Sequence, residues 1–284
     1  VDTLRELGAD IEYDKEEGFP PLRIIGKTLL KNEVRMKANV SSQYISALLL
    51  MATKLENGLT LHLEGKITSV PYIKMTLSLL DQLGVETSFE GQIIQIKPYL
   101  DTVSKTFTVE SDWSSASYFY SIVALSPVGT QINLSTYKKD SLQGDAVLQE
   151  IYMHLGIQTT FEGSKINLKK TNTNLPDSLD LDLANAPDIA QTIVVTCLGL
   201  QMKCKLTGLH TLKIKETDRL EALKNEIYKF GTSIDITDDS LHLLNPKPLK
   251  SGAAVETYND HRMAMAFAPL ALRTSFSIKE AEVV

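Results

Sequence analysis

The residues best suited to chemistry are charged side chains at predicted helix starts, and the clearest of them lie in YNDHRMAM, residues 258–265. His261 and Arg262 stand where this polar stretch turns into an apolar helix. The first turn of a helix has free N–H groups and a positive dipole end, so an arginine there is unfavourable by itself. An anion held between Arg262 and the helix amides would remove that penalty. The segment therefore predicts a binding site for a small anion.

A second charged segment, KIKETDRL at residues 213–220, has helical spacing. Lys215 and Arg219 lie four residues apart and Glu216 and Arg219 lie three apart, so on a helix they would share one surface. The simplest interpretation is a solvated, ion-paired helix face. The alternative is that these charges converge on a ligand.

Other polar residues at predicted helix starts also have two interpretations. Asp188, after a proline in DLANAPDIAQT at residues 182–192, is either a helix cap or a general base for a substrate hydroxyl. Ser41 and Ser42 in ANVSSQY (38–44), and Ser69 in TSVPY (68–72), suit N-caps. The functional alternative is that these hydroxyls and the nearby amides hold a phosphate, with Gln43 reaching a second ligand.

The elements that position these residues follow an internal repeat. Four glycines close amphipathic helix-like runs at intervals of 76, 72 and 75 residues: Gly8, Gly84, Gly156 and Gly231. After two of them the sequence repeats as VETSFEGQIIQIK (85–97) and IQTTFEGSKINLK (157–169), which predicts paired strands. A polar start, an apolar helix and a strand recur between the glycines at 41–63, 114–134, 188–206 and 261–278. Each repeat therefore predicts a βαβαββ unit, with three whole units, a partial unit at each end and a domain boundary near 106–112.

Composition limits the class of protein. The chain has 284 residues, enough for two domains, and its net charge of −6 disfavours a general nucleic-acid binder. Cys197 and Cys204 lack metal-ligand spacing and are expected to be small buried side chains. The sequence contains no apolar run of transmembrane length and no signal peptide, so we expect a cytoplasmic location. The chain begins with Val1 inside a helical pattern, and we expect it to be truncated at both ends.

Taken together, the charged segments resemble the EPSP synthases, the 3-phosphoshikimate 1-carboxyvinyltransferases. The resemblance rests on KETDR at 215–219 and NDHRMAM at 259–265, with SSQ, SVPY and APD upstream in that order. PPLRIIG (20–26), SDWSSASYF (111–119) and DSLQGD (140–145) agree with it, so it covers essentially the whole chain.

The resemblance implies an α/β (α+β) enolpyruvyl transferase-like fold of two domains, built of βαβαββ units and incomplete here. It implies a partial shikimate 3-phosphate-binding domain at 1–109 and a catalytic, phosphoenolpyruvate-binding domain at 110–284. It also implies a reaction in which the 5-hydroxyl of shikimate 3-phosphate adds to C2 of phosphoenolpyruvate while C3 is protonated. The intermediate then loses phosphate and a C3 proton. No metal or organic cofactor is implied, and the full-length protein is expected to be a monomer without nucleic-acid or membrane partners.

The family's functional residues carry over position by position. The resemblance implies three catalytic residues: Asp188 binds the shikimate hydroxyls and serves as the base, Glu216 handles the C3 proton, and Lys215 contacts shikimate 3-phosphate. It assigns substrate binding to two further groups. Arg219 and Arg262 clamp phosphoenolpyruvate, and His261 next to Arg262 is a further substrate-binding residue. Ser41, Ser42 and Ser69 hold the shikimate phosphate, Tyr72 lines the shikimate site, and Gln43 touches both substrates.

The sequence departs from the family's pattern in two respects. Thr211 stands where many members have an asparagine, which puts its role as a ligand in doubt. An N-terminal lysine motif, an Asn-Gly-Thr stretch, one phosphoenolpyruvate-binding arginine and a C-terminal lysine have no counterpart, so we expect the chain alone to have little activity. Two alternatives stay open: an enolpyruvyl transferase for another acceptor such as UDP-N-acetylglucosamine, and a non-enzymatic clamp-like scaffold.

Overall fold

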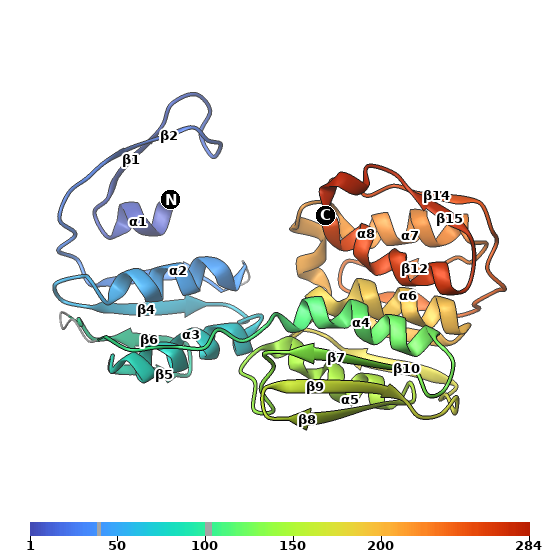
Figure 1. Cartoon of the computed structure of the whole chain (residues 1–284). Coiled ribbons are helices and arrows are strands. Elements are labelled where there is room, and N and C mark those ends of the chain that lie inside the picture. Colours follow the sequence, from blue (N-terminus) through green and yellow to red (C-terminus); the bar gives the residue numbers. More distant parts are fainter. Residues whose placement is uncertain (39–40, 100–103) are drawn as a thin grey trace. The chain divides into compact units, whose positions relative to one another are not determined.

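The computed structural model describes residues 1–38, 41–99 and 104–284. The chain divides into two compact units, Val1–Phe107 (unit 1) and Thr108–Val284 (unit 2). Both combine helices with small sheets (Figure 1). The predicted α/β fold built of repeated units is confirmed. No helix in the described part of the chain has the length and apolar character needed to cross a membrane.

Unit 1 contains one whole βαβαββ repeat. In chain order its elements are β3 (Glu33–Lys37), α2 (Ser42–Ala52), β4 (Leu59–Glu64), α3 (Val70–Leu83), β5 (Thr87–Glu90) and β6 (Ile93–Ile96). The sheet order is β3-β4-β6-β5, with β3 and β4 parallel and the other pairs antiparallel. Before it come α1 (Asp2–Glu6) and the antiparallel pair β1 (Asp10–Tyr13) and β2 (Leu22–Ile25).

Unit 2 repeats the same topology. Its one complete repeat among the described residues consists of β10 (Ser178–Asp182), α6 (Ala190–Leu200), β11 (Lys203–Thr207), α7 (Arg219–Lys229), β12 (Asp235–Ile236) and β13 (Leu241–Leu243). The sheet order β10-β11-β13-β12, with β10 and β11 parallel, matches the sheet of unit 1. The chain ends with β14 (Ala253–Val255), α8 (His261–Phe267), the short 3-10 helices η4 (Ala268–Leu272) and η5 (Ala281–Val283), and β15 (Phe276–Ile278), which pairs in parallel with β14.

The repeat at the start of unit 2 differs from the expected pattern. It has α4 (Trp113–Leu125), β7 (Gln131–Ser135), the 3-10 turn η1 (Gly144–Val147), α5 (Leu148–Met153), β8 (Ile157–Glu162) and β9 (Lys165–Lys170), in the sheet order β7-β9-β8. The described residues before α4 form no strand. Of these, Ser111 reaches β7 by one side-chain bond to Ser135 and one backbone bond to Thr136, too few for a ladder. Two of the three expected whole units therefore have all four strands.

The predicted helix-ending glycines are confirmed by their backbone angles. Gly84 is the C-cap of α3 with φ +96°, a left-handed conformation that residues with a Cβ rarely adopt. The equivalent glycines Gly8, Gly156 and Gly231 have φ values of +103°, +79° and +89°. After two of the four, β5–β6 and β8–β9 form the predicted hairpins.

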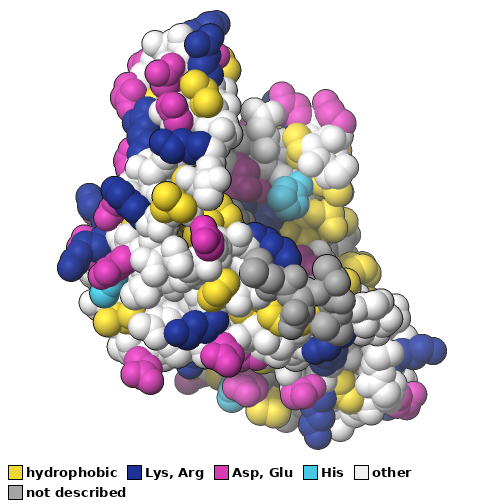
Figure 2. All heavy atoms as spheres, turned by 90° about the vertical axis from the view of Figure 1, so that its left-hand side faces the viewer, with side chains coloured by type: hydrophobic (Ala, Val, Ile, Leu, Met, Phe, Trp, Pro, Cys, Tyr) yellow, Lys and Arg dark blue, Asp and Glu magenta, His cyan; other side chains and the backbone are white. Residues whose placement is uncertain are grey.

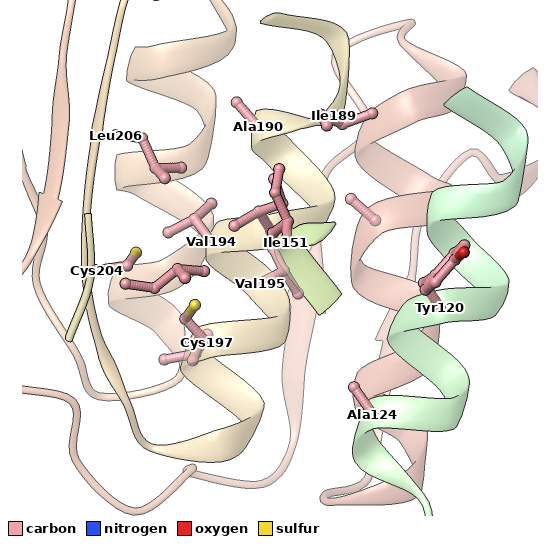
Figure 3. Close-up of a cluster of buried hydrophobic side chains, with 14 of the residues drawn as sticks. Tyr120, Ala124, Ile151, Ile189, Ala190, Val194, Val195, Cys197, Cys204 and Leu206 are labelled. Carbon is pink, nitrogen blue, oxygen red and sulfur yellow. The ribbon is translucent and has the colours of Figure 1, made fainter. Parts of the chain in front are cut away.

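At the centre of unit 2, α6 packs against both α4 and α8 (Figure 1). Figure 3 shows α4 and α6 next to each other, with Ile189 and Ala190 at one end of α6 and Cys197 toward the other. Cys197 and Cys204 are free thiols that are 0% and 1% exposed, which confirms the prediction of small buried side chains.

Hydroxyl pairs bind the two central helices together inside this apolar core. Ser117 and Thr192 approach to 3.0 Å, and Thr196 donates to Ser121 at 2.8 Å. Buried hydroxyls cost free energy unless they are hydrogen-bonded, so these pairs fix how α4 lies along α6. Over the face of unit 1 that Figure 2 shows, acidic and basic side chains are interspersed.

Candidate active site

The polar helix starts of unit 2 converge because of the sheet topology. α6 follows β10 and α7 follows β11, and these two strands are parallel, so both helices start at the same edge of the sheet. α8 packs against α6. The arrangement places the first turns of three helices close together.

Asp188 lies at the centre of this group. Its Oδ1 is 3.2 Å from Nη1 of Arg219 and 3.6 Å from Nζ of Lys215, while its Oδ2 is 3.5 Å from Nη2 of Arg262. The Arg262 guanidinium also reaches the Asp188 carbonyl oxygen at 3.5 Å. These residues come from three separate segments of the chain. The carboxylate of Asp188, which is 25% exposed, therefore lies next to three cationic side chains.

Arg219 is enclosed by carboxylates. Its side chain is 1% exposed, and its Nε donates to Oδ2 of Asp260 at 2.7 Å. Nη2 donates to Glu216 at 2.5 Å and Nη1 donates to Asp188. Arg262 and Lys215 are more accessible, with side chains 16% and 22% exposed. A ligand anion would therefore meet Arg262 and Lys215 first, and would reach Arg219 by replacing Glu216, the most exposed carboxylate of the group at 47%.

The electrostatics of Asp188 follow from this crowding. Burial, the largest single influence, raises the pKa of its carboxyl, but the charges of Arg262, Lys215 and Arg219 together outweigh burial and hold the pKa below its usual value. Burial likewise lowers the pKa of Arg262, while Asp188 and Tyr118 raise it, with a net upward shift. The mutual attraction of the two groups therefore favours their charged forms.

The prediction that KIKETDRL (213–220) lies on a helix is wrong for most of this segment, because the helix begins later. Residues 210–214 form the 3-10 turn η3 (His210–Ile214), residues 215–218 are irregular, and α7 begins at Arg219. Asp218 is the N-cap, because its Oδ1 accepts from the amides of Leu220 and Glu221 at 3.1 Å. Glu216 therefore contacts Arg219 from the loop before the helix, rather than along a helix face.

Two acidic residues that the sequence analysis did not single out hold this group in place. Asp260 caps α8 by accepting from the amide of Arg262 at 2.9 Å, and the same carboxylate binds Arg219. The loop before it has two consecutive left-handed residues, Tyr258 and Asn259, each with φ +56°. Such a backbone costs free energy and persists only where the surroundings enforce it.

Glu226 of α7 supplies that constraint. Its side chain is fully buried and accepts from the Tyr258 hydroxyl at 2.8 Å and from the Glu256 amide at 3.0 Å. Lys229, one turn later on α7, pairs with Glu226 at 2.7 Å and donates to the Ala254 carbonyl at 2.9 Å. The only sequence signal for Glu226 is its i, i+3 spacing to Lys229, which is common on solvated helices.

The remaining predicted residues of unit 2 differ in their surroundings. Thr211, in η3, is 6% exposed, and its Oγ1 has no hydrogen-bond partner among the described residues. His261 is the first residue of α8 and is exposed, with no ion pair to the described carboxylates. The structure thus brings together Asp188, Lys215, Glu216, Arg219 and Arg262, but not His261.

Unit 1 places its own predicted residues at two adjacent helix starts. α2 follows β3 and α3 follows the parallel strand β4, and the Ser46 and Thr76 hydroxyls lie 2.9 Å apart, so the helices begin at the same edge. Ser41 is the N-cap of α2 and accepts from the Gln43 amide at 3.4 Å. Asn39 and Val40 of the predicted ANVSSQY segment lie outside the described residues.

The N-terminus of α3 has no side-chain cap. Ser69 has φ +52° and makes no side-chain cap bond, although it is the N-cap residue. The neighbouring Thr68 is 4% exposed, and its Oγ1 has no partner among the described residues. Ser42 is 9% exposed and Gln43 is exposed. The first turn of α3 therefore has hydroxyl and amide donors that its own capping does not use.

The fold is that of an α/β protein, and the cations gathered at its helix starts are an arrangement suited to small anions. Two solved EPSP synthases from Acinetobacter baumannii share this fold, with a TM-score of 0.73 at 22% and 23% sequence identity. They cover 99% and 100% of this chain, which in turn covers 65% and 66% of theirs.

Sequence comparison then identifies the family. The family model for EPSP synthase (3-phosphoshikimate 1-carboxyvinyltransferase) matches residues 1–284. A 3-phosphoshikimate 1-carboxyvinyltransferase of Bacteroides fragilis is 47% identical over 100% of this chain and 70% of its own length. The enzyme of the same name from a Sulfurovum species is 36% identical over 99% of this chain and 65% of its own. The chain belongs to the EPSP synthase family, whose members are carboxyvinyl transferases.

Proposed function

We propose that this chain contributes substrate-binding surfaces to a 3-phosphoshikimate 1-carboxyvinyltransferase, which transfers the enolpyruvyl group of phosphoenolpyruvate to shikimate 3-phosphate. The observation that carries the proposal is Asp188, whose carboxylate lies within 3.6 Å of Lys215, Arg219 and Arg262. A deprotonated base surrounded by cations suits a reaction between two anionic substrates that needs a hydroxyl proton removed.

Each step of the reaction has a candidate group in unit 2. Asp188 accepts the proton of the shikimate 5-hydroxyl as its oxygen bonds to C2 of phosphoenolpyruvate, and C3 takes a proton from Glu216. The C2–O bond to phosphate then breaks as the proton held by Asp188 passes to the departing phosphate oxygen. Glu216 takes back a C3 proton, and the products are EPSP and phosphate. Lys215 and Arg262 neutralise the charges of the bound anions.

The exposure of Glu216 suggests how it is made available. In the structure its carboxylate accepts a hydrogen bond from Nη2 of Arg219. A ligand carboxylate would compete for the same donor, and its binding would release Glu216 to take up a proton from solvent and pass it to C3. We assign the shikimate 3-phosphate side to unit 1, where Ser41, Ser42 and Ser69 lie at the starts of α2 and α3 and Gln43 and Tyr72 lie in their first turns.

The experiment is a phosphate-release assay with both substrates. It compares this chain with the same chain extended at both ends by the flanking segments of the Bacteroides fragilis relative. We expect turnover in the extended protein and little or none in the chain alone, because the family's further charged residues have no counterpart here. Asp188→Asn in the extended protein should abolish turnover. Its retention would contradict the assignment of Asp188 as the base.

A further inference from the structure

A second group of cations lines a separate cavity of unit 2. The cavity has a volume of about 390 Å³ and lies where α4, α6 and η4 end. The described residues around it include Lys170 and Arg273, with the polar side chains of Ser126, Thr173 and Gln201, and no aspartate or glutamate. Its volume is in the range of small-ligand pockets.

Lys170 is buried without a counter-charge. It is the last residue of β9, is 2% exposed, and its Nζ donates to the carbonyl of Leu155 at 2.6 Å. An ammonium group has three protons to donate, and the described residues provide this one acceptor. Burial, and then the charge of Arg273, lower the pKa of Lys170. A buried ammonium normally has an anionic partner, because an isolated one is costly.

Arg273 adds a second unpaired charge. It follows the last residue of η4 and is exposed, and its guanidinium makes no hydrogen bond or ion pair with the described residues. The two like charges face the same cavity and oppose each other. Thr173 and Gln201 also have side-chain donors that the described residues leave unused.

Helix ends account for only part of this arrangement. The C-terminal ends of α4 and α6 carry partial negative charge, which would attract cations. Part of that charge is already satisfied by backbone amides: Ser126 donates to Val123, Gln201 to Leu198 and Met202 to Cys197. The partial charges that remain fall off within a turn and do not explain a guanidinium that bonds to no carbonyl.

We propose that this cavity is an anion site for a phosphate dianion or a phosphomonoester, held between Lys170 and Arg273. The arginine fork binds two phosphate oxygens and the lysine supplies a point charge to a third, while Thr173 and Gln201 donate to the rest. The site is distinct from the Asp188 group, because it lies at the opposite end of α6. That helix has 11 residues, so the separation is about 16 Å. The proposal does not depend on the transferase activity.

The test is a titration of the isotope-labelled chain with inorganic phosphate at constant ionic strength, followed by amide NMR shifts. We expect saturable shifts at Gly199 and Gln201 that persist in Arg262→Gln, since that substitution disables the other cation group. Arg273→Gln should weaken this binding about tenfold or more, as expected for the loss of a charge-assisted hydrogen bond. Lys169→Gln, an exposed neighbour on β9, is the matched control and should leave it unchanged.

Three results would overturn the proposal. Shifts confined to the surroundings of Arg262 would assign phosphate binding to the other group alone. Equal weakening by Arg273→Gln and Lys169→Gln would indicate general charge screening. Unchanged binding in Arg273→Gln would show that the cation pair only neutralises helix ends. A parallel titration with glycerol 3-phosphate separates the two ligand sources, because binding of inorganic phosphate alone would exclude a phosphomonoester.

Discussion

The Nε of Arg219 donates a hydrogen bond of 2.7 Å to Oδ2 of Asp260, and both side chains are at most 1% exposed. The other oxygen of the same carboxylate accepts from the backbone amide of Arg262 at 2.9 Å. One buried aspartate therefore couples the start of α7 to the start of α8. It fixes the two arginines of the candidate site relative to each other, although they lie 43 residues apart in the sequence.

This coupling predicts that Asp260→Asn destabilises unit 2. The substitution keeps the shape of the side chain but removes the charge opposite a buried guanidinium. Breaking a buried ion pair costs about 3–5 kcal/mol, and Arg219 keeps Asp188 and Glu216, so we expect a loss of about 3 kcal/mol in the free energy of unfolding. Urea denaturation measures it. Asp238→Asn, whose side chain is 96% exposed and pairs with Lys213, is the control and should change little.

Glu226→Ala is predicted to disturb the candidate site through the loop before α8. Truncation leaves the Glu256 amide and the Tyr258 hydroxyl without their acceptor, at a cost of about 1–3 kcal/mol each. The left-handed pair at Tyr258 and Asn259 would then relax and misplace Asp260.

The measurement for this position combines stability with kinetics in the extended protein. We expect kcat/KM for phosphoenolpyruvate to fall together with the free energy of unfolding, and Glu226→Gln, which keeps an acceptor oxygen, to restore part of both. Glu221→Ala on the same helix is the matched control, since its side chain is 49% exposed. If both alanine variants behave alike, Glu226 is not a positioning residue.

Arg262→Lys is predicted to weaken phosphoenolpyruvate binding in the extended protein. Lysine keeps the positive charge but loses the two-pronged guanidinium. Loss of one charge-assisted hydrogen bond corresponds to about 1.5–3 kcal/mol, and hence to roughly a ten- to hundredfold higher KM. Steady-state kinetics with varied phosphoenolpyruvate tests this, with the exposed Arg23→Lys as control. An unchanged KM would remove Arg262 from the proposed site.

The stability of unit 2 is predicted to depend on pH through Asp188. The folded-state pKa of its carboxyl is lowered, because Arg262, Lys215 and Arg219 together outweigh the opposing effect of burial. A lowered pKa stabilises the folded state above the unfolded value of about 3.9, and this stabilisation is lost as the pH falls through the folded value. Asp188→Asn should therefore flatten the acid limb of a plot of unfolding free energy against pH, while leaving its slope near neutral pH unchanged. An acid limb as steep as that of the unsubstituted chain would contradict the predicted role of these charges.

Local features of the fold could be predicted from the sequence because they depend on neighbours along the chain. The period of the four glycines, the hairpins after Gly84 and Gly156, and the helix starts at Ser42 and His261 depend on backbone angles, caps and alternation of apolar residues. The parallel crossovers in turn explain why polar residues at the starts of α2 and α3, or of α6 and α7, lie at one edge of their sheet.

Tertiary packing decided which of these residues touch. Asp218, and not the spacing of Lys215 to Arg219, sets where α7 begins, because its side chain satisfies two amides of the first turn. Asp260 and Glu226 are ordinary in the sequence, and their contacts span 41 and 32 residues. No local sequence pattern predicts that Lys170 and Arg273 line the same cavity. Contacts of this range depend on how α4, α6, α7 and α8 pack against one another, and the free energy of that packing is a property of the whole unit rather than of a segment.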